Sequence, residues 1–409
     1  MPIKYNGAFN PEIGMRIFLS AFISDDANSP GGSGSNQVLL VGEYGSGKST
    51  LMVHLAQDAV YLERGSKKQF IYRYVHNLPI DKFKIRNTTV LWRIRDADYF
   101  PSFFDGNSQK CFPGRQCKKA HIFIHEEDAE RITFFRFGKD KKPEALPNMP
   151  EIETYKDTPD LVDKIHEGHI NCILEYQQYR LSSELNNAVL EATAEYVGKQ
   201  VDDKAKDELD SAQKKPGRGR PRKIKDFTQH AIRAAVMWVD IYRAIMTRWG
   251  SKPIAIFCDE FDDALPQICS GPHWHVAQAW SQWARDFRKL NISSVISTHG
   301  WGLLHPSVYA RCNVKLMMRG TKKSEANTQI RYTRSFSNLD TGLMIADNGT
   351  EFGIAPFSKI DYLVQGRVDG LIGSSPAFSA ETAKEIRAQY SLKSPIEQNA
   401  EIKTEEVMA

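Results

Sequence analysis

This chain has few cysteines, no long apolar run and little net charge. Its 409 residues include only 6 cysteines without a regular spacing, which argues against a secreted disulfide scaffold and for reduced thiols. No apolar run approaches the roughly 20 residues that a membrane-spanning helix needs, and the first residues lack an apolar signal core. We therefore expect a cytoplasmic protein without a transmembrane segment, which a protein partner recruits to its place of action.

Other absences narrow the class of protein. The net charge of +4 is too small to identify a partner, so local charge must do so. The chain has no internal repeat and no Asn-Lys-x-Asp element that would read guanine. A hydrophobic content of 41% nevertheless allows a sizeable core in one large domain or several smaller ones.

A glycine-rich stretch, "VGEYGSGKST" at residues 41–50, follows a short apolar run and precedes a helical pattern. Its spacing of glycine, four residues, glycine, lysine and a hydroxyl residue predicts a P-loop, because glycines let backbone N–H groups face phosphates. A chance glycine-rich turn is the alternative. The predicted ATP-binding residues are Gly42, Gly45, Gly47, Lys48, Ser49 and Thr50. Lys48 is expected to reach the β- and γ-phosphates, and Ser49 to hold Mg²⁺.

An apolar strand that ends in acids supplies the second half of this site. In "PIAIFCDEFDD" we expect Asp259, at the end of a strand neighbouring the P-loop strand, to bind Mg²⁺ through water. Glu260 is expected to polarise the attacking water, so the pair predicts hydrolysis; a capped strand end on the surface is the alternative. Asp262 and Asp263 are interpreted as solvated loop acids, with a role of one of them in positioning metal or DNA as the alternative.

The chain pattern predicts an α/β fold: a RecA-like P-loop ATPase core with a mostly parallel central sheet flanked by helices, plus a β-rich and helical insertion. We expect the polar end from Leu392 onward to be disordered. The predicted division is an N-terminal lead at 1–36, core at 37–68, a β-rich insertion at 69–180, a helical segment at 181–250 with a basic loop at 214–225, core at 251–365, and a tail at 366–409.

The order of motifs after Glu260 resembles the HerA/FtsK superfamily of hexameric DNA-pumping ATPases, which includes conjugative coupling proteins and viral packaging motors. The match covers roughly residues 37–62 and 253–357, and it runs through Arg288, Lys289, Ser297, Thr298, Asn313 and Arg319. The resemblance implies a homo-oligomeric ring, a hexamer, that acts on double-stranded DNA.

The same resemblance suggests the remaining catalytic residues. Thr298 and His299 occupy the sensor position, where the family has a glutamine in place of His299; a histidine packed beside Trp301 is the alternative. Arg319 matches the position of an arginine finger that reaches a neighbouring subunit's nucleotide, with Arg311 and Arg285 as rivals and a surface ion pair as the alternative. The full catalytic set is Lys48, Glu260, Thr298, His299 and Arg319.

A basic run, "KKPGRGRPRKIK" at 214–225, carries seven positive charges and no acid. Its Arg-Gly-Arg-Pro centre is the core of an AT-hook, whose two arginines enter the narrow minor groove of AT-rich duplex. A nonspecific basic linker is the alternative. The predicted DNA-binding residues are Lys215, Arg218, Gly219, Arg220, Pro221, Arg222 and Lys223.

A group of cysteines and histidines raises the possibility of a zinc site. Cys111, Cys117, His121 and His125 have ligand types that suit tetrahedral Zn²⁺, and buried thiols with solvated histidines are the alternative. The other close pairs are interpreted as structural or polar-face histidines; they are His166 with His169 and His273 with His275.

Three functions remain open from the residues. The leading one is a DNA-stimulated ATP hydrolase that moves double-stranded DNA, as in plasmid transfer, packaging or DNA processing. The second is a nucleotide-switched ATPase that binds or loads AT-rich DNA without translocating. The third is a P-loop ATPase with a protein substrate, whose basic segment is incidental.

Overall fold

The structure is a computed structural model of the whole chain. It describes residues 37–61, 88–94, 120–130, 132, 135–137, 142–145, 151–175, 227–250, 252–267, 272–321, 339–348, 352–356, 380–394 and 397. The expected N-terminal lead, the helical stripe from Leu181 to Gly198 and the basic run at 214–225 lie outside these residues.

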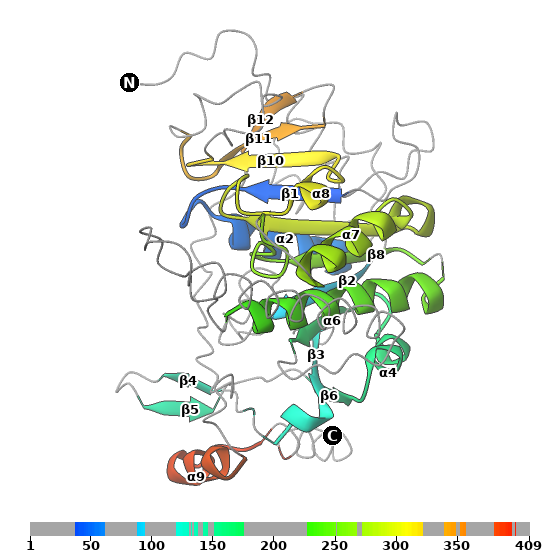
Figure 1. Cartoon of the computed structure of the whole chain (residues 1–409). Coiled ribbons are helices and arrows are strands. Elements are labelled where there is room, and N and C mark those ends of the chain that lie inside the picture. The colour runs from blue at the N-terminus through cyan, green and yellow to red at the C-terminus, as the bar shows by residue number, and fades with distance from the viewer. Residues whose placement is uncertain are drawn as a thin grey trace, which may run out of the picture.

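One ten-stranded sheet organises the described part of the chain (Figure 1). In spatial order its strands are β12 (Phe352–Pro356), β11 (Leu343–Asp347), β10 (Val314–Met318), β1 (Gln37–Val41), β9 (Ile292–Thr298), β8 (Ile254–Cys258), β2 (Thr89–Ile94), β7 (Ile170–Leu174), β3 (Ala120–His125) and β6 (Glu151–Tyr155). The strands from β10 to β6 are parallel, and β11 and β12 are antiparallel additions. The predicted α/β class with a mostly parallel sheet is confirmed.

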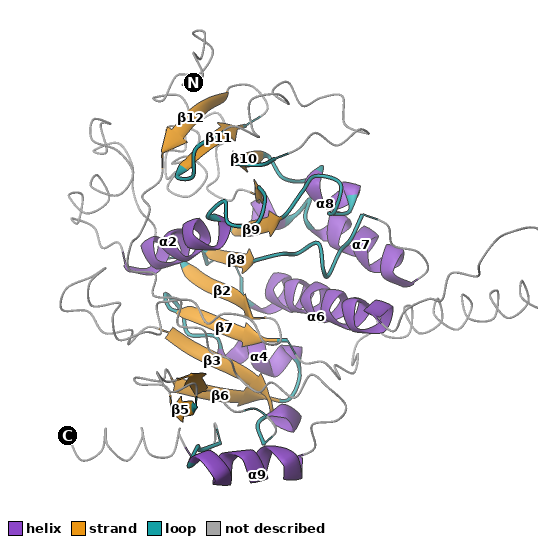
Figure 2. Cartoon of the chain, turned by 90° about the vertical axis from the view of Figure 1, so that its left-hand side faces the viewer, coloured by secondary structure: helices purple, strands orange, loops and turns teal. Residues whose placement is uncertain are grey.

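Helices cover both faces of this sheet, which explains why its central strands are nearly uniformly apolar. Figure 2 shows α2 (Lys48–Tyr61) on one face and α4 (Thr158–Lys164), α6 (Phe227–Arg248), α7 (Pro272–Trp283) and α8 (Pro306–Tyr309) on the other. Strands β1 (QVLLV) and β8 (IAIFC) are buried at every position. None of the helices in the described ranges is long and apolar enough to span a membrane.

The core between the sheet and its second helical layer is aromatic. Trp238 and Tyr242 of α6, Trp280 of α7 and Phe287 of the 3₁₀ turn η5 (Phe287–Leu290) are fully buried. The Tyr242 and Phe287 rings stack with centroids 4.8 Å apart. The sequence predicts one helix over 275–290, but α7 ends at Trp283, and η5 ends at Leu290 and is capped by Asn291, which has a left-handed φ of 55°. These rings fix α6 and α7 above β8 and β9.

The segment 69–180 is β-rich as predicted, but it is not separate from the core sheet. Its strands β2, β7, β3 and β6 extend the same sheet beyond β8, and only β4 (Phe135–Phe137) and β5 (Pro143–Ala145) form a separate pair. The sequence could not indicate this because strand order in a parallel sheet depends on long-range pairing. How the chain divides into domains stays a prediction.

The C-terminal tail contains more order than expected. Helix α9 covers Ala380–Tyr390, and Arg387 Nη1 donates a hydrogen bond of 2.7 Å to the carbonyl oxygen of Glu130, just after the 3₁₀ turn η4 (Glu126–Asp128). Leu392 and Ser394 are buried. The expectation of disorder from Leu392 onward is therefore wrong for its first residues.

Candidate nucleotide-binding site

The glycine-rich loop lies between β1 and α2, at the carboxyl edge of the parallel strands. Gly45 and Gly47 have φ values of 75° and 95°, in a region that residues with a Cβ rarely adopt. A Cβ at Gly42 would lie 2.6 Å from Ser46 Oγ. The loop leads directly into the N-terminus of α2 at Lys48, where free backbone N–H groups favour an anion. The predicted strand, glycine loop and helix of a P-loop are all present.

Lys48 points back into this loop and is buried. Its Nζ donates hydrogen bonds of 2.8 Å to the Gly42 carbonyl and 3.1 Å to the Glu43 carbonyl, and lies 3.3 Å from His299 Nδ1. Burial lowers the pKa of Lys48, while the carboxylates of Asp259 and Glu260 oppose that shift. The ammonium therefore lies among oxygens that a phosphate group can replace.

Asp259 faces the first helical turn across the carboxyl edge of the sheet. Ser49 Oγ donates a 2.6 Å hydrogen bond to Asp259 Oδ2, and Ser297 Oγ donates to Asp259 Oδ1. One expectation is wrong: Asp259 does not follow a strand next to β1, because β9 lies between β1 and β8. The intervening strand leaves a gap that the Ser49 and Asp259 side chains bridge, and such a hydroxyl and carboxylate suit Mg²⁺.

Glu260 and His299 form a second contact at this edge. His299 Nε2 lies 2.9 Å from Glu260 Oε1. Because a lysine ammonium has only donors, the contact of Lys48 with Nδ1 requires Nδ1 to accept, so Nε2 carries the proton that Glu260 accepts. His299 thus connects Lys48 to Glu260. Its ring also stacks on Tyr44 with centroids 6.4 Å apart, which favours the site interpretation over packing beside Trp301.

The backbone that carries Glu260 is held by Ser297, one of the residues in the family match, and by Arg93, which the sequence did not single out. Glu260 has a left-handed φ of 49°, and its N–H donates a 2.8 Å hydrogen bond to Ser297 Oγ. Arg93 Nη1 donates to the carbonyl oxygens of Asp259 and Glu260 at 3.0 and 3.2 Å. Arg93 of β2 and Ser297 of β9 therefore fix the acidic turn from the two strands that flank β8.

Arg93 belongs to a buried polar network. Its Nε donates to Glu175 Oε1 at 2.5 Å, and the same oxygen accepts a 2.7 Å hydrogen bond from Trp238 Nε1. The Arg93 and Glu175 side chains are only 1% and 3% exposed. The guanidinium also lies 5.6 Å from the centroid of the Phe261 ring. A buried ion pair with hydrogen bonds on both partners makes a rigid support for the turn above it.

No family model and no curated protein matches this chain. Among solved structures, the genome packaging NTPase B204 from Sulfolobus turreted icosahedral virus 2 in complex with AMP is 12% identical, with 80% of this chain and 98% of that chain covered and a TM-score of 0.32. VirB4 of Thermoanaerobacter pseudethanolicus is 9% identical, with 80% and 91% covered and a TM-score of 0.36. EssC (ATPases 2 and 3) from Geobacillus thermodenitrificans is 10% identical, with 87% and 44% covered and a TM-score of 0.31. All three TM-scores are below 0.5, so these likenesses do not indicate what this chain does.

Thr298 and Asp262 differ from their sequence interpretations. Thr298 is fully buried, and its hydroxyl donates 3.1 Å to the Gly300 carbonyl and accepts 3.3 Å from the Gly300 N–H. It therefore shapes the turn that carries His299. Asp262 is not a solvated loop acid, because burial raises its pKa and its Oδ1 is buried without a hydrogen-bond partner. The side chain of Thr50 lies outside the described residues.

Arg319 lies beside the chain's own glycine loop. Its Nε forms a 3.0 Å ion pair with Glu43 Oε1, and Nη1 lies 3.4 Å from Thr341 Oγ1. A Cβ at Gly320 would lie 2.3 Å from Glu43 Cδ, so this glycine leaves space for the pair. Reaching a neighbouring subunit would require Arg319 to leave Glu43. The other two candidates for the arginine finger are Arg311 and Arg285. Arg311 Nε donates to Ser281 Oγ at 3.2 Å, and Arg285 is exposed.

Two other predicted sites fall partly or wholly outside the described residues. The AT-hook run lies entirely outside them, as do Cys111 and Cys117. His121 and His125 both lie on β3, but His125 Nε2 is 2.9 Å from the Lys156 carbonyl, and Nδ1 accepts 3.3 Å from the Glu127 N–H. Since both of its ring nitrogens have partners, His125 is unsuited to complete a zinc set.

Proposed function

We propose that this chain is a P-loop ATPase that couples ATP hydrolysis to movement of double-stranded DNA, acting as a homo-oligomeric ring. The observation that carries the enzymatic part is the convergence of Lys48, Ser49, Asp259, Glu260 and His299 at the carboxyl edge of the sheet, within hydrogen-bond distance of one another in pairs. A glycine loop alone would support binding; an acid beside it supports hydrolysis.

The chain's residues divide the work as follows. The glycine loop and the N-terminus of α2 bind the phosphates, and Lys48 exchanges its bonds to Gly42 and Glu43 for bonds to phosphate oxygens. Mg²⁺ bound through Ser49 and Asp259 would neutralise phosphate charge. Glu260 accepts a proton from the attacking water, whose oxygen bonds to the γ-phosphorus while the bond to the β-phosphate oxygen breaks. His299 holds Glu260 through Nε2–H.

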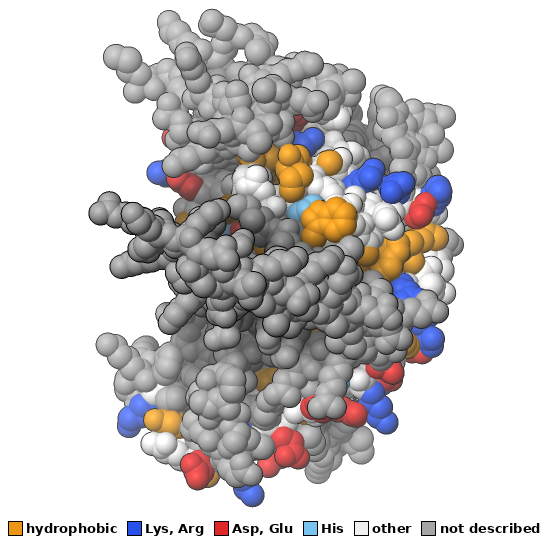
Figure 3. All heavy atoms as spheres, viewed as in Figure 1, with side chains coloured by type: hydrophobic (Ala, Val, Ile, Leu, Met, Phe, Trp, Pro, Cys, Tyr) orange, Lys and Arg blue, Asp and Glu red, His pale blue; other side chains and the backbone are white. Residues whose placement is uncertain are grey.

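The DNA part of the proposal is supported by basic residues. The Arg218-Gly219-Arg220-Pro221 core gives the chain a minor-groove element. On the described surface, basic side chains gather near α7 and α8 (Figure 3), where Arg285, Lys289 and Arg311 are exposed. Phosphate contacts by such residues are independent of sequence, as a moving motor requires. The hook would then recruit AT-rich duplex, and other surfaces would track it.

The proposal is tested by ATP turnover of the purified chain with and without double-stranded DNA. We expect stimulation by duplex, and directional displacement of a triplex strand if the chain translocates. Stimulation without displacement favours the nucleotide-switched loader, and turnover indifferent to DNA favours a protein substrate. Particle images of the same sample measure the number of subunits in the ring.

Replacing Lys48 with alanine should abolish nucleotide binding. The change removes the ammonium that lies among the loop carbonyls, and it leaves the phosphates with backbone N–H groups alone. Binding of a fluorescent ATP analogue measures the loss. Lys289→Ala, which removes an exposed lysine paired only locally with Asp286, is the matched control and should bind ATP normally. Unchanged binding by Lys48→Ala would remove this loop from the nucleotide site.

Replacing Arg218 and Arg220 with alanine should weaken binding to AT-rich duplex more than to GC-rich duplex. Both arginines are expected to enter the minor groove, whose negative potential is strongest where AT tracts narrow it. Fluorescence anisotropy with matched AT-rich and GC-rich duplexes at fixed salt measures the difference. Lys214→Ala with Lys225→Ala removes the same charge outside the core as a control. An equal loss on both duplexes would reduce the run to a nonspecific linker.

A further inference from the structure

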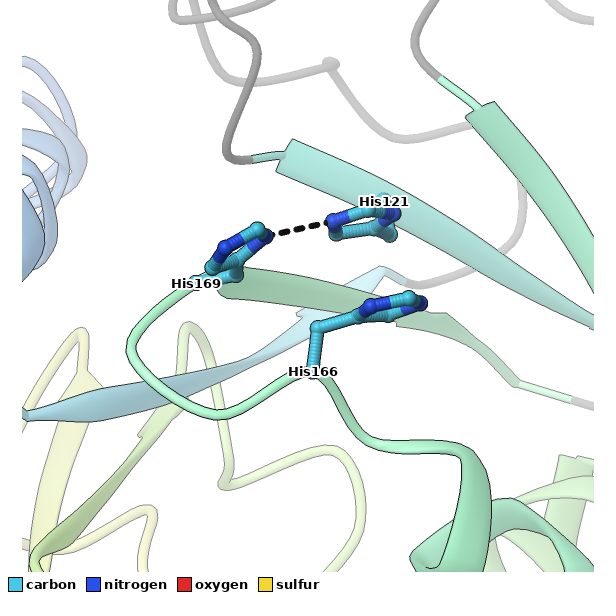
Figure 4. Close-up of side chains that lie close together, drawn as sticks. All are labelled: His121, His166 and His169. Carbon is cyan, nitrogen blue, oxygen red and sulfur yellow. Dashed lines mark hydrogen bonds between the residues drawn. The ribbon is translucent and has the colours of Figure 1, made fainter.

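A cluster of three histidines lies near the amino ends of the parallel strands β3 and β7, whereas the glycine loop lies at the carboxyl ends of the strands. His121 is the second residue of β3, and His166 and His169 lie on the turn that enters β7 (Figure 4). The His121 and His166 rings stack with centroids 3.7 Å apart, and His121 Nε2 lies 2.7 Å from His169 Nδ1. Glu151 and Glu153 share one face of β6 beside them, with His121 in register with Glu151. The sequence interpretation considered His121 apart from the His166 and His169 pair.

The turn that carries two of the histidines is held rigidly by Asn171. This side chain is fully buried; its Oδ1 accepts 2.9 Å from the His166 N–H, and its Nδ2 donates to the carbonyls of His166 and His169, both at 3.1 Å. Gly168 has a φ of 73°, which allows the turn to close. The backbone of β3 and of the turn that enters β7 therefore fixes the positions of the three rings.

One buried ring nitrogen in this cluster lacks a hydrogen bond. His121 is 5% exposed, and its Nδ1 is buried without a partner. Glu151 Oε2 and Glu153 Oε1 each lie 3.6 Å from that nitrogen, beyond hydrogen-bond distance. Burial, with the neighbouring His166 and His169, lowers the pKa of His121 to about 3, so the ring is neutral. An orphaned buried nitrogen between two carboxylates is costly unless something fills the gap.

We propose that this cluster binds one divalent transition-metal ion of the zinc type, through His121 Nδ1, Glu151, Glu153 and His166 Nε2. Ligand atoms about 2.0–2.2 Å from a tetrahedral zinc lie roughly 3.3–3.6 Å from one another, which matches the separations that are too long for hydrogen bonds. His166 Nε2 lies within hydrogen-bond distance of Glu153 Oε1, the oxygen that also faces His121, so this one contact has to lengthen to the ligand spacing when the ion binds. Two carboxylates balance the charge of the ion, and two imidazoles favour zinc over Mg²⁺ or Ca²⁺.

His169 is assigned as a positioning residue. Metal-bound histidines donate their second ring N–H to a fixed acceptor, which selects the tautomer with a lone pair on the metal side. If His121 Nε2–H donates to His169 Nδ1, the lone pair of His121 lies on Nδ1, toward the glutamates. The ion would brace β3, β6 and the β7 turn from the edge opposite to the nucleotide site. This set shares only His121 with the cysteine-containing set considered from the sequence.

The test uses the full chain, stripped with a chelator and titrated with Co²⁺ as a visible probe and with Zn²⁺ in competition. We expect one ion per chain, d–d bands of a site without thiolate, and a rise of the melting temperature with Zn²⁺. Glu153→Gln and His121→Asn should lose stoichiometric binding, and His169→Gln should weaken it about 10–100-fold. Circular dichroism of the stripped variants shows whether they fold.

Two controls decide between sites. His125→Asn, on the same strand but bonded to the Lys156 carbonyl, should bind Co²⁺ as the unchanged chain does. Cys111→Ser with Cys117→Ser should also have no effect. Loss of binding in the cysteine variant, a thiolate charge-transfer band, or less than stoichiometric binding by the unchanged chain would each overturn the proposal. Normal binding by folded Glu151→Gln with Glu153→Gln would do the same.

Discussion

Glu260→Gln should bind ATP normally and turn it over about 10²–10⁴-fold more slowly, the usual contribution of a positioned general base. The amide keeps an oxygen that accepts the His299 Nε2–H, so the contact of 2.9 Å and the turn geometry survive. It cannot accept the proton of the attacking water at neutral pH. Single-turnover hydrolysis and equilibrium binding of the same preparation separate the two effects.

Asp263→Asn is the matched control for this change. Asp263 is an exposed acid on the same turn, and its replacement also removes one negative charge. We expect turnover by Asp263→Asn to be unchanged, because the slow turnover predicted for Glu260→Gln comes from the lost general base and not from the lost negative charge. Turnover by Glu260→Gln equal to that of the unchanged chain would remove Glu260 from its role, and equal losses in both variants would point to bulk electrostatics.

Local patterns predicted the elements of the nucleotide site because each depends on adjacent residues. The glycine spacing needs only the loop itself, and the apolar run before Asp259 needs only a buried strand. The order of the strands needs pairing between distant residues, and for that reason the insertion of β9 between β1 and β8 was not foreseen. That strand contributes Ser297, which links the Asp259 carboxylate to the Glu260 N–H.

The histidines also show that local sequence patterns do not predict contacts between distant segments. His121 and His125 both lie on β3, although their spacing suits a helix as well as a strand, and their chemical partners come from elsewhere. His121 contacts the β7 turn and β6, whereas His125 Nε2 is hydrogen-bonded to the carbonyl of Lys156, just after β6. Their different surroundings depend on β3 lying between β6 and β7, and no short-range pattern encodes that order.

Arg93→Met should destabilise the fold by about 3–5 kcal/mol, because it leaves the Glu175 carboxylate buried without its partner. Trp238 Nε1 would still donate its hydrogen bond to Glu175 Oε1. Urea denaturation measures the free energy of unfolding. The double change Arg93→Met with Glu175→Gln should recover most of that loss, since a neutral amide replaces the uncompensated charge and can still accept from the indole. Equal stability of the single and double variants would show that the ion pair does not matter.

The double variant also separates stability from catalysis. With the fold restored, the carbonyl oxygens of Asp259 and Glu260 still lack the guanidinium that holds them at 3.0 and 3.2 Å. The left-handed Glu260 backbone then keeps its hydrogen bond to Ser297 but loses the one from Arg93, so the carboxylate is positioned less accurately for the attacking water. We expect kcat to remain depressed while the apparent affinity for ATP is nearly unchanged, because Lys48 and the glycine loop are untouched. Full recovery of kcat together with stability would make Arg93 a purely structural residue, whereas a raised KM would move its influence from the acidic turn to the phosphate loop.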